Sequence, residues 1–173
     1  GTFSIGLLTS KINLEGPIIK GKTSFNISAR RSYLDLLAKP FMPDDEKYSY
    51  YFYDMNAKIN HKFSDRSRMF LSAYHGKDHF AADYDGNTDF KDGSNMGWGN
   101  TIVSARWNYI FNNRLFSNTT VSYNNYLFDV NAYTNNQYST GAGAIILNRY
   151  SSNYHSGITD WSYQIDFDYN PTP

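Results

Sequence analysis

The chain has 173 residues, no cysteine, and sixteen acidic residues that balance sixteen basic ones to a formal charge of zero. Neutrality gives no electrostatic case for a nucleic-acid partner or for adsorption to anionic lipid. The lack of cysteine excludes disulfides, thiolate metal sites and cysteine nucleophiles. Aromatic residues make up 18% of the chain. They favour pleated, half-buried strands, so the composition predicts an all-β protein.

The chain opens on residues 2–15, which fit one long strand or a tight hairpin folded near residues 8–10. Residues 24–30 then alternate apolar and polar side chains and predict a strand. Residues 51–63 show the clearest period of two: tyrosine, methionine and isoleucine lie on one face, and aspartate, asparagine and lysine on the other. This pattern predicts a strand with one apolar and one polar face.

Four further strands are predicted by the same alternation. Residues 161–169 alternate as cleanly as 51–63, while 69–74, 99–111 and 115–127 alternate with a few exceptions. Each strand of about 10 to 15 residues is longer than the usual 5 to 6 and suits a tilted crossing of a hydrocarbon layer. No apolar run reaches the roughly 20 residues that a membrane helix needs.

The connections alternate between short and long. Residues 16–22, 64–67, 112–114 and 170–173 are rich in turn-forming residues. Between them lie the longer stretches 35–47, about 77–97 and about 131–155. Alternation of tight periplasmic turns with long extracellular loops is typical of outer-membrane barrels. We therefore expect residues 1–173 to form a segment of about seven or eight strands of an antiparallel transmembrane β-barrel. The alternative is a soluble carbohydrate-binding β-sandwich whose core holds the aromatic rings.

Short strings along nearly the whole chain resemble one family. They include LEGPI at 14–18, SARRSYLD at 28–35, YFYDMNAKIN at 51–60, FSNTT at 116–120 and SGITD at 156–160. These strings resemble the start of the barrel in TonB-dependent outer-membrane receptors of the Bacteroidetes type.

The resemblance implies a 22-strand barrel with an N-terminal plug in the bacterial outer membrane. Such a barrel imports a nutrient (a glycan, siderophore, cobalamin or peptide) with energy from the TonB complex, often together with a surface lipoprotein. This chain would supply about the first third of the barrel and would belong to a larger polypeptide, because an isolated arc leaves unpaired edges in lipid. The alternative role is a barrel component of an outer-membrane assembly or scaffold complex without transport.

One loop has the spacing of a cation site. Asp83, Asp85 and Asn87 match the first three ligand positions of a calcium-binding EF-hand loop, and Asp89 follows. Thr88 stands where such a loop needs glycine, and Ser94 where it needs a bidentate glutamate. The hypothesis is a structural calcium ion, against a solvated acidic loop.

Two larger groups are candidates for binding. Charged residues on the predicted polar face would face the lumen and a plug domain: Arg30, Asp54, Lys58, Arg106, Asp166 and Asp168. Aromatic residues in the predicted long loops would contact a transported ligand or, as the alternative, pack the loops together: Phe41, Tyr84, Phe90, Trp98, Tyr133, Tyr138 and Tyr150. The four histidines lack the spacing of a metal site. No catalytic motif is present, so no enzyme activity is expected.

Overall fold

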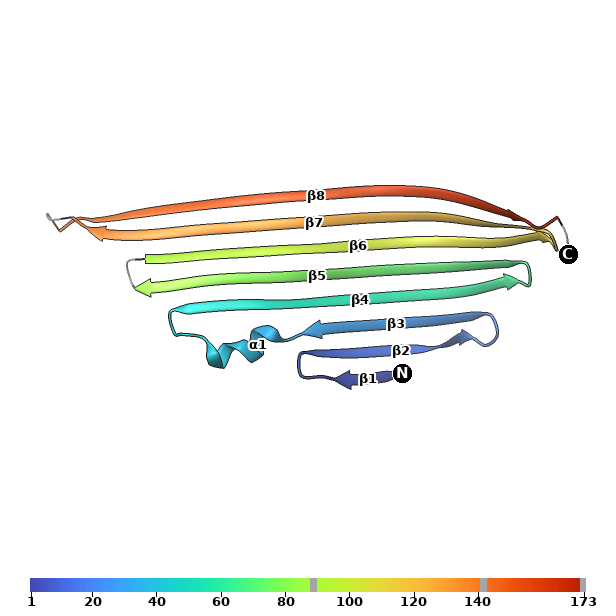
Figure 1. The fold of residues 1–173 in the computed structure, drawn as a ribbon, viewed down its shortest axis with the longest axis horizontal. Coiled ribbons are helices and arrows are strands. Elements are labelled where there is room, and N and C mark those ends of the chain that lie inside the picture. The colour runs from blue at the N-terminus through green and yellow to red at the C-terminus, as the bar shows by residue number, and fades with distance from the viewer. Residues whose placement is uncertain (88–89, 141–142, 172–173) are drawn as a thin grey trace.

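Eight strands form one antiparallel sheet in which spatial order follows chain order (Figure 1). The computed structural model describes residues 1–87, 90–140 and 143–171. The strands are β1 (Thr2–Ile5), β2 (Thr9–Ile19), β3 (Thr23–Ser32), β4 (Glu46–Ser64), β5 (Ser67–Asn87), β6 (Phe90–Asn112), β7 (Leu115–Ser139) and β8 (Ile145–Tyr169). The all-β, antiparallel prediction is confirmed, and the sheet is open between β1 and β8.

The opening segment takes the hairpin alternative. β1 pairs with β2 from Thr2 opposite Asn13 to Ile5 opposite Ser10. The Gly6 amide donates to the Thr9 carbonyl at 2.8 Å and closes the turn between them. The hairpin therefore folds at residues 6–8, slightly before the predicted position.

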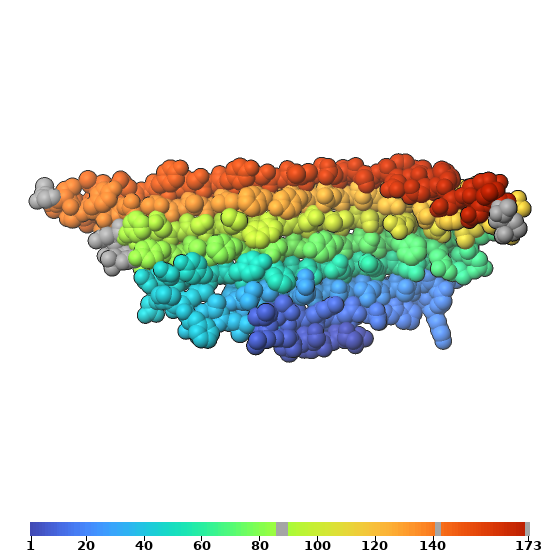
Figure 2. All heavy atoms as spheres, viewed as in Figure 1, coloured from blue at the N-terminus to red at the C-terminus, as the bar shows by residue number. Residues whose placement is uncertain are grey.

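Strand length rises from 4 residues in β1 to 25 in β7 and β8, and one side of the sheet grows outward in steps (Figures 1 and 2). The tight turns lie together at the opposite side, at residues 20–22, 65–66 and 113–114. The last two were predicted, and the first is shorter than the predicted 16–22 because β2 continues to Ile19. On the stepped side, α1 (Leu34–Ala38) and the short helix η1 (Lys39–Phe41) join β3 to β4. In the described residues, neither helix is long and apolar enough to cross a membrane.

Two of the predicted long loops are wrong. Residues 77–87 and 90–97 pair with each other as the extended arms of β5 and β6, and pairing of β7 with β8 continues to Ser139 opposite Ile145. These stretches are rich in glycine, asparagine and aspartate, which is a composition typical of loops. The hairpin nevertheless continues, because each added pair satisfies the backbone groups of both strands.

The sheet is a single layer without a hydrophobic core. Among the described residues, no large apolar side chain is buried, and the two most buried polar residues are Ser32 and Ser117. All strands belong to one sheet, so the described residues do not build the two packed sheets of a sandwich. Whatever covers the two faces comes from outside this sheet.

The strand register sorts the side chains into two faces, because directly paired residues of an antiparallel sheet point the same way. One row of paired residues runs across the strands through Ala57, Ala73, Val103, Tyr123 and Trp161. We name the side of the sheet to which these side chains point face A. The neighbouring row on the other side, face B, runs through Lys58, Ser72, Ser104, Ser122 and Ser162. The predicted alternation of apolar and polar faces is confirmed here.

Ser32 joins β3 to β4 where their regular pairing ends. The Phe52 amide donates to Ser32 Oγ at 2.8 Å, and the Ser32 side chain is fully buried. We predict that Ser32→Ala leaves the Phe52 amide without a partner, at a cost of about 1–3 kcal/mol, and accelerates its hydrogen exchange about tenfold or more. Ser28→Ala, on the same strand, is the control and should leave that exchange unchanged. Equal exchange in both variants would show that Ser32 does not hold the strands together.

Candidate functional site

An apolar band crosses face A on all the longer strands. In β4 it extends from Tyr53 to Phe63, and in β8 from Trp161 to Tyr169. Many of its side chains are exposed, including Val103 at 48% and Trp161 at 74%, and the others are half-buried. The aliphatic members are Ile12, Leu14, Ile27, Ala29, Met55, Ala57, Ile59, Leu71, Ala73, Val103, Ala105, Val121 and Ile165.

Aromatic rings mark both borders of this band. Near the tight turns, the rings of Tyr109 and Phe111 lie 4.9 Å apart, and Phe167 is 6.5 Å from Phe111. At the other border, the Tyr51 ring lies 4.9 Å from that of His79. The band is thus an apolar strip of limited height between two rows of rings.

Face B is polar behind the apolar band. The six residues predicted to share the polar face all lie on it, from Arg30 and Asp54 on β3 and β4 to Asp166 and Asp168 on β8. Arg30 Nε donates to Asp54 Oδ2 at 2.7 Å. The register therefore brings these charges to one surface, although they come from four of the eight strands, β3, β4, β6 and β8.

Between the row of Asn56 and the tight turns, the charges that β4–β8 carry on this surface are separated by sign. Four cations lie on β4–β6, namely Lys58, Lys62, Arg68 and Arg106, whereas β8 carries three carboxylates, Asp160, Asp166 and Asp168. Of these cations, only Lys62 has a carboxylate within salt-bridge distance among the described residues, and that partner is Asp65 in the adjacent turn. The remaining charges are available to a partner.

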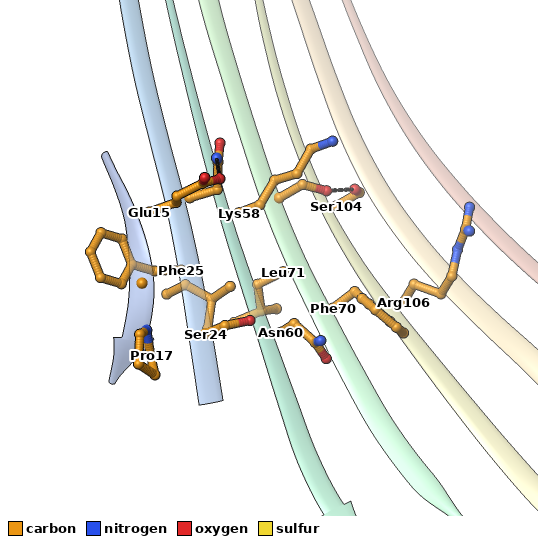
Figure 3. A pocket seen from close by; sticks show the side chains of 14 residues that line it. Glu15, Pro17, Ser24, Phe25, Lys58, Asn60, Phe70, Leu71, Ser104 and Arg106 are labelled. Atoms are coloured by element: carbon orange, nitrogen blue, oxygen red, sulfur yellow. Dashed lines mark hydrogen bonds between the residues drawn. The ribbon is translucent and has the colours of Figure 1, made fainter. Parts of the chain in front are cut away.

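A shallow hollow of about 770 Å³ lies over the cationic part (Figure 3). Figure 3 shows two adjoining rows of face B, with Glu15, Lys58 and Ser104 in one, and Asn60, Phe70 and Arg106 in the next. Between Lys58 and Arg106, Ser72 Oγ and Ser104 Oγ are hydrogen-bonded at 2.8 Å. Short hydroxyl side chains here leave room for another element to approach the sheet closely.

We call the direction along the strands away from the tight turns upward. Above the apolar band in this sense, face B becomes apolar. Two successive rows place aromatic and aliphatic side chains side by side: Tyr50, Phe52, Phe80, Met96, Trp98, Phe128, Val130 and Tyr154. We name this group the upper aromatic patch. Arg30 lies 5.0 Å from the Phe52 ring centre, and Tyr50 donates its hydroxyl proton to Asp78 at 2.8 Å. Rings with neighbouring charges can stack on a ligand and orient its polar groups.

The predicted ligand-contacting aromatics are mostly strand residues, which corrects their assignment to loops. Only Phe41, in η1, lies in a connection, and its side chain is 88% exposed. Five share face B, toward or beyond the upper aromatic patch: Tyr84, Phe90, Trp98, Tyr138 and Tyr150. Tyr133 lies on the opposite face, beside Gly93. Strand pairing thus collects most of them on one surface.

The sequence interpretation missed Tyr50, Phe52, Phe80, Phe128 and Tyr154 as members of this surface. A local signal exists at residues 50–53, where four consecutive aromatics break the period of two. Such a run places rings on both faces of a strand, which marks the height at which the apolar side changes.

The proposed calcium ligands lie in the arm of β5. Asp83 accepts a hydrogen bond from Tyr133 at 3.0 Å, and Asp85 pairs with Lys91 at 3.1 Å. Asp89 and the side chain of Asn87 lie outside the described residues. In the part that is described, no group of three or more histidine, aspartate or glutamate residues is placed to hold a metal ion. The calcium site stays a prediction.

The histidines are engaged locally. His61 shares a hydrogen bond with Thr23 at 2.8 Å, and His75 with Thr101 at 2.9 Å. His155 pairs with Asp129 across β7 and β8. His79 stacks on Tyr51. All four lie on face A, at or near the borders of the apolar band.

No family model, curated protein or solved structure matches this chain.

Tyr133 on β7 offers a test of how β7 contacts the hairpin formed by the arms of β5 and β6. Its ring lies over Gly93, and its hydrogen bond to the Asp83 carboxylate raises the pKa of Tyr133 above the ordinary tyrosine value. The neutral phenol is favoured by this arrangement, so its contribution to the order of the hairpin is present below the ordinary tyrosine pKa of about 10 and is lost as pH rises through the higher folded value.

A Cβ at Gly93 would overlap the Tyr133 ring and the Asp83 carboxylate. We predict that Gly93→Ala displaces the ring, breaks this hydrogen bond and returns the pKa of Tyr133 toward that of free tyrosine. Site-specific NMR of labelled tyrosine measures the change. Gly97→Ala is the control, since its Cβ would meet the nearest side-chain atom, Lys77 Cε, at 3.5 Å. An unchanged Tyr133 pKa in Gly93→Ala would contradict the contact.

Proposed function

We propose that this sheet is part of the wall of a transmembrane β-barrel in the bacterial outer membrane, with face A toward lipid and face B toward the lumen. The observation that carries the proposal is the contrast between the two faces at one height. The row of Ala57, Val103 and Trp161 is apolar on face A, and the adjoining row on face B is lysine and serine. Alternation of lipid-facing and lumen-facing residues is what a transmembrane strand requires.

The height of the apolar band supports the same conclusion. The ten residue steps from Tyr53 to Phe63 cover about 33 Å along the strand at about 3.3 Å per residue. With the usual strand tilt of about 40°, this corresponds to about 25 Å along the barrel axis, the height of the apolar zone of outer-membrane barrels. The bordering tyrosines and phenylalanines then form the aromatic girdles.

The two edges of the sheet set a further requirement. β8 presents 25 residues, and among the described residues only β7 pairs with it. Unpaired backbone groups are very costly in hydrocarbon, so the proposed wall needs further strands beside β8 and β1. The resemblance to TonB-dependent receptors suggests a total of 22, of which this sheet would be about the first third.

In this arrangement the tight turns face the periplasm, and the long hairpin arms of β5–β6 and β7–β8 project outside the cell. The separated charges on face B suit a plug domain with complementary charge. The upper aromatic patch lies above the polar part of the lumen, where an incoming ligand would first be held. The proposed activity is therefore import of a nutrient through a plugged barrel, coupled to the TonB complex.

The lipid-facing assignment can be tested with two adjacent residues. Val103 lies on face A near the middle of the band, and Ile102 lies on face B; both are β-branched and exposed. We predict that Val103→Lys in the full-length native protein sharply reduces assembly into the outer membrane, because a lysine facing lipid at the midplane costs about 2–4 kcal/mol. Ile102→Lys, the matched control, should assemble almost normally, since its charge would face a polar lumen.

The measurement is the amount of heat-modifiable protein in isolated outer membranes. Equal loss in both variants, or greater loss for Ile102→Lys, would reject the assignment of face A to lipid. Recovery of the folded native protein in solution without detergent would reject the membrane proposal as a whole.

A further inference from the structure

Two cations lie in one row at the upper border of the apolar band, with one strand between them. Arg31 on β3, Tyr53 on β4 and Lys77 on β5 are direct partners in one row of face A. Two strand spacings of about 4.8 Å place the backbones of the two cations about 10 Å apart. Both side chains are exposed. The row above contains Tyr51 and His79, so the cations lie among the rings that border the band.

Of the two cations, Arg31 already has a carboxylate partner, whereas Lys77 is available to a ligand. The Arg31 guanidinium lies 5.1 Å from the Tyr51 ring centre, which holds it at the border, and 3.4 Å from the Asp35 carboxylate of α1. Lys77 has no carboxylate within salt-bridge distance among the residues described. The other nearby carboxylate, Asp129, pairs with His155.

A groove runs beside Lys77 toward the apolar band. It has a volume of about 180 Å³, and Gly99 forms its floor between Lys77 on one side and Leu127 on the other. Gly99 has no side chain on face A, and the Lys77 side chain reaches over the next position of that strand, Gly97. Thr101 and the apolar residues of the band follow along β6. A polar head at the two cations would therefore continue directly into an apolar strip.

We propose that Arg31 and Lys77 bind the phosphate-bearing headgroup of an anionic lipid in the outer leaflet, whose acyl chains lie along the apolar band of face A. The inference rests on the proposed membrane function and adds a specific ligand to it. Arginine offers paired donors to phosphate oxygens, and lysine adds a point charge. A soluble anion would use the same two cations but would gain nothing from the groove and the band.

This site changes what the net charge implies. A formal charge of zero gave no reason to expect contact with anionic lipid. The register nevertheless gathers two cations on face A at the one height where headgroups would lie. Attraction to a headgroup depends on charges within about one Debye length, about 8 Å at physiological salt, and not on the sum over the chain.

The test uses the full-length native protein, extracted in mild detergent and mixed with equal amounts of phosphatidylglycerol and phosphatidylcholine. Native mass spectrometry then counts each bound lipid. We expect the wild-type protein to retain phosphatidylglycerol preferentially, and the Arg31→Gln/Lys77→Gln double variant to lose about 25-fold in this preference, about fivefold per cation. Lys47→Gln is the matched control: it removes a cation from face A of β4, six residues above Tyr53, and should retain the preference.

Glycerol 3-phosphate, which has the phosphate without acyl chains, is the second probe and should not displace the bound lipid at equal concentration. The lipid site is overturned if the wild-type protein shows no preference, if the double variant keeps it, or if glycerol 3-phosphate displaces the lipid. Lys77→Gln alone, with an expected loss of about fivefold, replaces the double variant if the latter fails to assemble. A native protein that needs no detergent would refute the barrel, whereas a detergent-dependent protein without headgroup preference would refute only this site.

Discussion

The structure depends on the backbone hydrogen-bond ladder of a sheet that has no core of its own. Each strand pairs with its chain neighbours, and among the described residues no large apolar side chain is withdrawn from the surface. The ladder fixes which residues share a row and a face, but it does not cover either face. A hydrophobic surface of this extent is stable only against another apolar medium or partner. The distribution of apolar and polar side chains over the two faces therefore indicates whether an apolar or a polar environment lies against the sheet at each height.

Along the strands, the apolar side of the sheet changes from face A to face B. Around Ala57 and Val103 face A is apolar and face B polar, whereas around Phe52 and Trp98 the aromatic side chains are on face B. The core face of a soluble sandwich would keep one apolar side along the whole strand. In the proposed barrel, a membrane of limited thickness would explain the change, because the lipid would end at one height and the strands continue into hairpin arms beyond it. The inner surface of those arms would then be free to carry rings that contact a ligand.

The alternation in residues 51–63 and 161–169 was sufficient to predict these strands and the assignment of their faces, because period and polarity are local properties. The tight turns at 65–66 and 113–114 were equally local. The extent of the hairpin arms was not predictable in this way, since residues 77–97 have the composition of a loop and become strand through their partners. The grouping of Trp98 with Phe52 and Phe128 depends on the register of β4–β7, which no single segment contains.

The charged residues, too, are grouped by the strand register in a way that the net charge of the chain does not show. The sum over the chain is zero, yet the lower part of face B has cations on β4–β6 and carboxylates on β8. The border of face A has Arg31 and Lys77 in one row, on either side of Tyr53. In the proposed barrel these three groups would meet three different surroundings: two regions of a plug surface and the lipid headgroups. A plug partner would then need acidic groups opposite Lys58 and Arg106 and basic groups opposite Asp166. The partners of such a wall follow from where its charges lie relative to the apolar band, because that band decides which charges face water, protein or lipid.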